Sequence, residues 1–463
     1  MPRSSVSYCL LLPLLCILVG CEYVRPTLNA PLKQWDREGG YRFSNLAPGG
    51  TDNSDSLLIL ATFSGGGSRA STLSFGVLRE LGRQQITWEG KHKRLLDELD
   101  SISALSGGTF TAAYYALYGD QIFHDFEHRF LRKDWEAELR SRILHSPGNW
   151  IRLWSPYFGR THIMAELLDE ALFEGHTYGD LLRRRQRPGL NIHATDMATL
   201  SRFEFNQAQF DWICSDLSQL PIARASASSA ALPLVLSPIS FKNYAGGCGF
   251  EVPGEAVESA LKRGGAAEQR AKEYLSYLDT KKRSTIHLLD GGLSDNMALR
   301  ALLEGSSVAG GVDNLMRVWH VKNVKKFVVL AVSAETSPDA MDFGGDQIPT
   351  LSKAISSLVD VPINRYSADS ITLMRHGVKM VREELRKRPR PADSPFAEDA
   401  EIYFIHAGLS EIADPEERES LMRIPTTLYL TDEHIDQLLL AASRLIRNDP
   451  EFQRLMIDLQ PSP

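Results

Sequence analysis

Several features that would assign this chain to common protein classes are missing from its sequence. No apolar run reaches the roughly 20 residues that a transmembrane helix needs. The net charge of −7 includes no long basic stretch, so nothing indicates nucleic-acid binding. No H-E-x-x-H motif or cysteine–histidine cluster indicates a metal hydrolase. The 463 residues, 43% hydrophobic and 24% charged, suit a globular protein with ample material for a core.

The first 20 residues differ from the rest of the chain. Arg3 precedes an apolar run from Tyr8 to Val19. A charged start before such a run predicts an export signal over residues 1–20, with a short buried strand or helix as the alternative. Leu18-Val19-Gly20-Cys21 resembles the lipobox of bacterial lipoproteins. That resemblance implies cleavage before Cys21 and acylation of this cysteine.

A lipoprotein would be attached to the bacterial cell envelope. Two or more acyl chains hold a protein stably on a membrane, whereas one chain is marginal. Glu22 stands where an Asp commonly marks retention at the inner membrane, so we expect the outer membrane. Residues 21–55 are polar and rich in Pro, Gly, Asn and Asp, which predicts a tether.

The five cysteines separate by position. Cys9 and Cys16 fall in the export signal, and Cys21 ends it. Cys214 and Cys248 remain, in an oxidising compartment if the chain is exported. A disulfide between them and two free buried thiols both stay open at this point.

Apolar runs and helical spacings alternate along the chain. A continuous run at Leu57–Phe63 precedes a glycine-rich turn and a helix, and the same unit recurs from Ser101 to Ala116. Strands separated by helices predict an α/β fold with a largely parallel sheet. Further strands are expected at Leu190–Ala194, Thr285–Leu289 and Phe327–Val332.

Three regions extend this core. Residues 121–160 are helical and aromatic, and they predict either a packed cap or a lid whose Trp and Tyr side chains lie at a membrane interface. Residues 254–283 form a charged helical insertion. Residues 336–463 are expected to be a mostly helical extension packed on the core, with one more strand at Glu401–Ile405.

Two glycine-rich turns follow predicted strands. In Ala104-Leu105-Ser106-Gly107-Gly108, small neighbours permit a sharp strand-to-helix turn that places the serine hydroxyl at a helix N-terminus. In Ser64-Gly65-Gly66-Gly67-Ser68-Arg69, consecutive glycines let backbone N–H groups converge on an anion. No lysine follows these glycines, which disfavours a nucleoside triphosphatase.

A third turn, Asp290-Gly291-Gly292, ends the strand predicted at Thr285–Leu289. Alone, each of the three turns can be an ordinary loop. Together they occur in the order glycine loop, serine, aspartate, each at the C-terminal end of a predicted parallel strand. Open α/β sheets bind ligands at that edge.

This order and these residues resemble patatin-like phospholipases from about Leu57 to Ser333. The family motifs read D-G-G-G-x-R-G, G-x-S-x-G and D-G-[GA]. Here Ser64, Ala70 and Ala104 replace the Asp, the last Gly of the loop and the first Gly of the elbow. Asn191–Asp196 and Ala223–Pro233 look similar too. The resemblance implies a three-layer sandwich with a mainly parallel central sheet and a catalytic domain over residues 56–335.

The resemblance also implies the site. Ser106 would be the nucleophile and Asp290 its base, in a Ser–Asp dyad. Arg69 would fix the glycine loop or meet a lipid phosphate. The substrate would be a phospholipid or another acyl ester, cleaved through an acyl-serine without metal or organic cofactor. The oxyanion hole would consist of the backbone N–H groups of Gly65, Gly66 and Gly67.

Three alternatives stay open. One is an inactive lipid-binding or scaffold lipoprotein with the same fold, and another is a protease or thioesterase that uses the same dyad. The third is a Ser-His-Asp hydrolase, in which a histidine follows the aspartate. His193 and His287 fall inside predicted strands. No glycine-rich or turn-rich setting surrounds the later candidates, which are His320, His376, His406 and His434.

Overall fold

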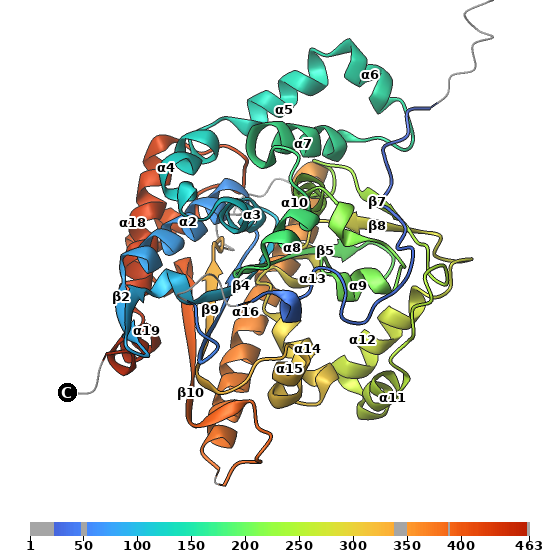
Figure 1. Ribbon diagram of the computed structural model, residues 1–463. Coiled ribbons are helices and arrows are strands. Elements are labelled where there is room, and N and C mark those ends of the chain that lie inside the picture. The colour runs from blue at the N-terminus through green and yellow to red at the C-terminus, as the bar shows by residue number, and fades with distance from the viewer. Residues whose placement is uncertain (1–22, 48–52, 338–349, 388, 461–463) are drawn as a thin grey trace, which may run out of the picture.

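An eight-stranded sheet organises the fold of this computed structural model, which describes residues 23–47, 53–337, 350–387 and 389–460 (Figure 1). The first five strands along the sheet run parallel, and β6 (Ser201–Glu204) pairs with β5 off the main path. The order is β10 (Phe396–Gly408), β9 (Val324–Ser333), β1 (Leu57–Phe63), β4 (Leu99–Leu105), β5 (Gly189–Asp196), β8 (Thr285–Leu289) and β7 (Ile239–Lys242).

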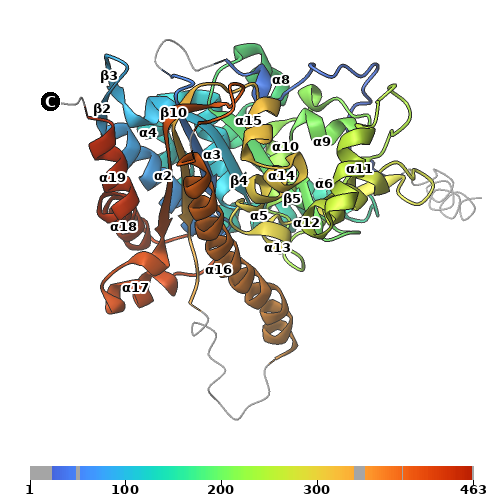
Figure 2. The ribbon, with the colours of Figure 1, turned by 90° about the horizontal axis from the view of Figure 1, so that it is seen from below.

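Alternate side chains of β1 enter two different cores. Leu57, Ile59 and Phe63 pack into the larger core, whereas Leu58 and Leu60 pack into the smaller one. A continuous apolar run is what a strand covered on both faces requires. The larger core includes α2 (Gly67–Arg83), α3 (Gly108–Tyr118) and α18 (Asp432–Asn448); the smaller includes α14 (Arg300–Ala309), α15 (Val312–Val318) and α16 (Leu351–Leu385) (Figure 2). The predicted three-layer α/β fold is thus confirmed.

One strand runs against the predicted direction. We expected Thr285–Leu289 to be parallel, but β8 is antiparallel to both β5 and β7. The chain leaves β7, passes through α11 (Gly254–Arg263) and α12 (Gly265–Ser276), and re-enters the sheet at the same end. A strand that is entered at the end where its neighbour was left must run antiparallel to that neighbour. The insertion at 254–283 therefore sets the direction of the strand that carries Asp290.

The C-terminal region contributes to the sheet as well as covering it. The strand predicted at Glu401–Ile405 is part of the longer β10, which pairs with β9 from Glu401↔Lys326 to Gly408↔Ser333. Thr431 caps α18 by accepting a hydrogen bond from the backbone N–H of His434. The remaining helices of this region are α17 (Pro415–Met422) and α19 (Pro450–Asp458).

The predicted tether is not a free linker in its described part. The backbone N–H of Leu32 donates to the carbonyl of Cys214 at 2.7 Å, and that of Trp35 donates to Cys248 at 2.8 Å. Tyr41 and Leu46 are buried in the larger core. The polar composition of the segment does not reveal this packing. Beneath this segment Cys214 and Cys248 form a disulfide with a Cα–Cα distance of 5.5 Å.

The predicted export signal and Cys21 lie outside the described residues. No helix in the described ranges is long and apolar enough to span a membrane. Besides the hairpin of β2 (Gln85–Trp88) and β3 (Lys91–Arg94), the connecting elements include three short helices. These are α8 (Tyr178–Arg184), α9 (Gln207–Asp211) and α10 (Ile222–Ser229).

The aromatic region 121–160 divides into two parts. Phe126, Phe130 and Trp135 are buried and stack on one another and on the larger core. Trp150 and Trp154 are exposed. The region is therefore a packed cap in its first half and an exposed surface in its second. Its helices are α4 (Ile122–Phe126), α5 (Trp135–Leu144) and α6 (Pro147–Leu153), followed by α7 (Arg160–Leu168).

Candidate active site

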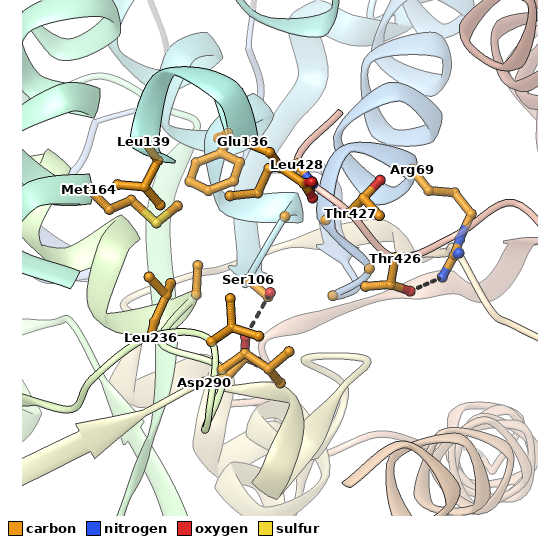
Figure 3. A pocket seen from close by; sticks show the side chains of 18 of the residues that line it. Arg69, Ser106, Glu136, Leu139, Met164, Leu236, Asp290, Thr426, Thr427 and Leu428 are labelled. Atoms are coloured by element: carbon orange, nitrogen blue, oxygen red, sulfur yellow. Dashed lines mark hydrogen bonds between the residues drawn. The ribbon is translucent and has the colours of Figure 1, made fainter. Parts of the chain in front are cut away.

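Strand register brings the predicted nucleophile and base together. β4 and β5 are parallel with Leu105 opposite His193, while β8 is antiparallel to β5 with Leu289 opposite Thr195. One residue beyond each pairing, Ser106 and Asp290 both come level with Ala194. The Ser106 hydroxyl donates to Asp290 Oδ2 at 2.8 Å (Figure 3). Although β8 runs antiparallel, its end still lies at the carboxyl edge of β4.

The backbone of Ser106 is in a conformation that non-glycine residues rarely adopt. Its φ is +46°, in the left-handed region. Its backbone N–H donates to Ser229 Oγ at 2.8 Å, and the Ser229 hydroxyl donates to the His193 carbonyl at 2.5 Å. Such strain persists only where neighbours hold the residue, and it clusters at functional sites. The elbow also packs tightly, because a Cβ on Gly107 would lie 2.0 Å from the Gly67 carbonyl oxygen.

Asp290 is a buried carboxylate with fixed partners. Its side chain is 4% exposed, and Oδ1 accepts from the backbone N–H of Gly292 at 2.8 Å. Burial raises the pKa of Asp290 to about 6, although the hydrogen bonds from Gly292 and Ser106 act in the opposite direction. With this pKa the carboxylate is ionised at neutral pH. A general base works best when its pKa lies near the working pH.

No described histidine lies where it could replace Asp290 as the partner of Ser106. In the described part of the chain, no histidine lines the cavity around Ser106 or bonds to Asp290. The His193 ring contacts Asn191, and the His287 ring contacts Ser240. His406 lies between Glu335 and Glu411, whose carboxylates raise its pKa to about 9 despite burial. The geometry offers the carboxylate as the group that can receive the Ser106 proton.

The glycine loop presents two of the three expected N–H groups. The N–H of Gly65 donates to the Asn296 carbonyl at 3.2 Å, so it is already bonded. In the described residues, no acceptor faces the N–H groups of Gly66 and Gly67, and both residues line the cavity. They lie at the N-terminus of α2, where the helix dipole favours negative charge. The expectation for Gly65 is therefore corrected.

Arg69 fixes the loop. Its side chain is buried and donates to the Ala334 carbonyl from Nε and Nη2 at 3.2 and 3.0 Å. Nη2 also donates to Thr426 Oγ1 at 2.9 Å, and Nη1 donates to the Ile424 carbonyl. Of the two expected roles, these contacts match loop fixing, since they hold the guanidinium against protein oxygens.

Residues 424–428 complete the site from the far end of the chain, and sequence reasoning missed them. The Ser68 N–H donates to the Thr427 carbonyl at 2.8 Å. The Leu428 N–H donates to Glu136 Oε1 of the cap at 3.0 Å. The segment therefore links the glycine loop to α5. No local pattern marks it; Ser229, in contrast, falls in the stretch 223–233 whose likeness to the family was visible.

A cavity of about 470 Å³ opens beside Ser106. This volume is typical of small-molecule sites. Its polar end holds Ser106, Asp290, the glycine loop and Asn296. Figure 3 shows apolar side chains from the cap and from the 232–236 loop around the hydroxyl. The apolar wall includes Leu139, Ile143, Leu144, Met164, Leu232, Val235 and Leu236.

Comparison with known proteins places this site in a family. The sequence model described as patatin-like phospholipase matches residues 61–303, which include the glycine loop, Ser106 and Asp290. A search of curated proteins found no match. Ala104, the departure from the family's first elbow glycine, is fully buried in the larger core.

Solved structures of similar arrangement share little sequence with the chain. Human GIVD cytosolic phospholipase A2 is 13% identical with a TM-score of 0.42, covering 88% of this chain and 62% of its own. VipD from Legionella pneumophila is 13% identical with a TM-score of 0.27, covering 92% and 72%. The chain thus spans about three fifths of the human protein's length. On the family match over more than half of its residues, the chain belongs to the patatin-like phospholipase family.

Proposed function

We propose that this protein is a serine lipid acyl hydrolase of phospholipase A or lysophospholipase type. Membership of a phospholipase family supports lipid hydrolysis as the activity. The observation that carries the finer assignment is the 2.8 Å hydrogen bond from Ser106 to Asp290 at the end of an apolar cavity. The inactive scaffold has no such observation in its favour, whereas a protease or a thioesterase would use the same dyad and differs in its substrate.

The proposed reaction uses Ser106 and Asp290 as a dyad. Asp290 accepts the Ser106 proton as the hydroxyl oxygen attacks the ester carbonyl. The N–H groups of Gly66 and Gly67 stabilise the oxyanion, a contribution that is usually large. The carbon–oxygen bond to the leaving alcohol breaks, and the alcohol takes the proton from Asp290. Water then attacks the acyl-serine with Asp290 again as base, which releases the fatty acid and restores the hydroxyl.

The cavity favours an acyl chain over a polar polymer as the group bound next to Ser106. Its wall is mainly aliphatic, and burying apolar surface contributes roughly 25 cal/mol per Å². A thioesterase would also accept an acyl chain. Competition between phospholipids, acyl thioesters and peptides for one labelled serine therefore separates these activities.

We further propose that the mature protein is anchored through an acylated Cys21 in the bacterial envelope, at the outer membrane. The support is the Leu18–Cys21 motif and the disulfide between Cys214 and Cys248, which suits an oxidising compartment. Radiolabelled palmitate should appear on the protein and be lost in Cys21→Ser. Unchanged labelling and membrane attachment of that variant would contradict the anchor.

A fluorophosphonate probe tests the hydrolase assignment. The probe should attach to Ser106, identified by mass spectrometry of the labelled peptide, and preincubation with phospholipid should slow the attachment. Purified protein should release fatty acids from mixed bacterial phospholipids. Absence of both labelling and fatty-acid release in folded protein would favour the inactive scaffold.

The pH dependence of kcat/KM should follow Asp290. The base acts only when ionised, and burial raises its pKa to about 6. Below pH 6 kcat/KM should therefore fall about tenfold per pH unit, and above it a plateau is expected. A soluble uncharged ester keeps lipid ionisation out of the measurement. The rate of fluorophosphonate attachment should share the same midpoint; a flat profile down to pH 4 would contradict Asp290 as the base.

Arg69→Lys distinguishes loop fixing from phosphate binding. Lysine keeps the charge but concentrates its donors on a single nitrogen, so it cannot reproduce the spread of the guanidinium contacts to Ala334, Thr426 and Ile424. We expect turnover to fall about tenfold or more, equally on an uncharged soluble ester and on a phospholipid. Thr426→Val, which removes one acceptor, should lose less. A loss confined to the phospholipid would support phosphate binding instead.

A further inference from the structure

Exposed apolar side chains gather on and around α6. Scattered single hydrophobic residues are normal on a protein surface, but a contiguous group indicates an interaction site. Trp154 is 88% exposed and Ile151 is 71% exposed. We call this group the α6 patch; it consists of Leu144, Trp150, Ile151, Trp154 and Tyr157.

The patch continues to the mouth of the cavity. Leu144 belongs to the patch and also lines the cavity. Across the mouth, Leu234 and Val235 are exposed as well, and Val235 lines the same cavity. The two sides are joined, since Arg160 Nη2 donates to the Leu234 carbonyl at 2.8 Å. Exposed apolar side chains thus border the path by which a lipid would reach Ser106 on two sides.

The described chain begins beside the same patch. The Ser155 hydroxyl donates to the Val24 carbonyl at 2.6 Å, and the Arg25 guanidinium lies 4.1 Å from the Tyr157 ring centre. Figure 1 shows the dark blue N-terminal segment next to α6. Tyr23, with its side chain 56% exposed, adds an aromatic ring here. Because two residues span at most about 7 Å, an acyl group on Cys21 would be attached close to this face.

Side-chain chemistry favours a lipid surface as the occupant. Trp and Tyr are the residues enriched where a membrane meets water, because their rings are apolar and their polar atoms find partners. Trp150 already satisfies its indole N–H by donating to the Ile143 carbonyl at 2.9 Å. Two basic residues near the patch are paired with carboxylates, Arg152 with Glu166 and Arg142 with Glu170, whereas Arg25 and Arg160 contact Tyr157 and the Leu234 carbonyl. We therefore expect the attraction to be mainly apolar.

We propose that the α6 patch docks on the membrane to which the N-terminus is anchored, so that the cavity opens toward that membrane. The enzyme would then draw substrate from its own bilayer, in cis, and not from a facing one. The inference rests on the proposed hydrolase function for its activity readout. For its geometry it rests on the proposed anchor at Cys21, the position of Tyr23 and the exposure of α6.

The test compares two substrates and two double variants of the acylated full-length protein. Ile151→Ser with Trp154→Ser removes apolar surface at positions that do not line the cavity. Leu440→Ser with Ile457→Ser does the same on α18 and α19, where both side chains are also exposed. Each protein is reconstituted in phosphatidylcholine vesicles and mixed with a second, protein-free population. A different labelled phospholipid marks each population, and turnover of a soluble ester is measured in parallel.

We expect wild-type protein to release fatty acid at least tenfold faster from its own vesicles than from the second population. The α6 double variant should lose at least tenfold of the cis rate while its soluble-ester turnover stays within twofold. The α18–α19 variant should retain both rates. Equal loss in the two double variants, an unchanged cis rate in the α6 variant, or equal cis and trans rates in wild type would each overturn the docking surface. Inactivity of the wild type toward the soluble ester would instead overturn the proposed function.

Membrane contact is also measured without catalysis. Brominated phosphatidylcholine quenches tryptophan fluorescence on contact, so wild-type fluorescence should fall in brominated vesicles. The α6 double variant should lose much of that quenching, since Trp154 supplies the most exposed indole of the patch. Quenching should persist in high salt because the attraction is apolar. Equal quenching of wild type and the α6 variant would contradict docking through α6.

Discussion

Replacing Asp290 with Asn is expected to lower ester turnover by about 10⁴-fold, nearly as far as Ser106→Ala. Asn keeps the shape of the side chain and a carbonyl oxygen for the Gly292 N–H, but it cannot accept the Ser106 proton. The two losses should be non-additive, because the residues act as one unit. Steady-state kinetics on a soluble ester measures each variant and the double variant.

Asp295→Asn is the matched control for this experiment. Asp295 is also buried and has a pKa raised to about 6 by burial, but it contacts the Arg300 backbone rather than Ser106. Its variant should retain most activity if thermal unfolding shows a folded protein. Single Ala substitutions at His320, His376, His406 and His434 should also leave substantial activity. A folded histidine variant as inactive as Ser106→Ala would refute the dyad.

Gly66→Ala is expected to lower kcat by about 10²-fold or more while the protein remains folded. Gly66 has a φ of +134°, which side chains rarely allow, so the substitution must turn the backbone and move the adjacent N–H groups. Loss of one oxyanion donor typically costs 10²–10³ in kcat. Gly66→Val, with a larger side chain, should lose at least as much.

Gly90→Ala provides the comparison for backbone strain alone. Gly90 has a φ of +79°, and no atom lies within 4 Å of the position where its Cβ would be. This variant should lose stability and keep kcat. Equal kcat in folded Gly66→Ala and wild type would remove the glycine loop from the oxyanion hole.

Local patterns in the sequence predicted the strands around the site well. The run Leu57–Phe63 coincides with β1, and Thr285–Leu289 coincides with β8. The predicted direction of β8 was wrong. A continuous apolar run indicates that a strand is buried on both faces, but it does not indicate at which end the chain enters the strand. That direction depends on the route through α11 and α12, which lies outside the strand.

Contacts between distant segments account for what the sequence did not predict. The hydrogen bond from the Gly65 N–H to the Asn296 carbonyl joins residues 231 positions apart. The composition around the glycines does not predict this contact. The packing of residues 23–47 and the contact of Thr427 with Ser68 are of the same kind. A short polar segment in a groove and one in solvent have similar compositions, so only the folded partner distinguishes them.

The attachment of Arg69 to Ile424 has a consequence for the moment at which the protein becomes active. Arg69 also contacts Ala334, but its contact with Ile424 joins residues that are 355 positions apart, so the anchor is complete only when most of the chain has been made. Synthesis at about 5–20 residues per second makes that interval roughly 20–70 seconds. During this time a growing chain has the proposed nucleophile Ser106 but not the full set of contacts that hold the glycine loop. In this order of assembly, the proposed hydrolase gains the full set of contacts that hold its glycine loop only once Ile424 has been synthesised.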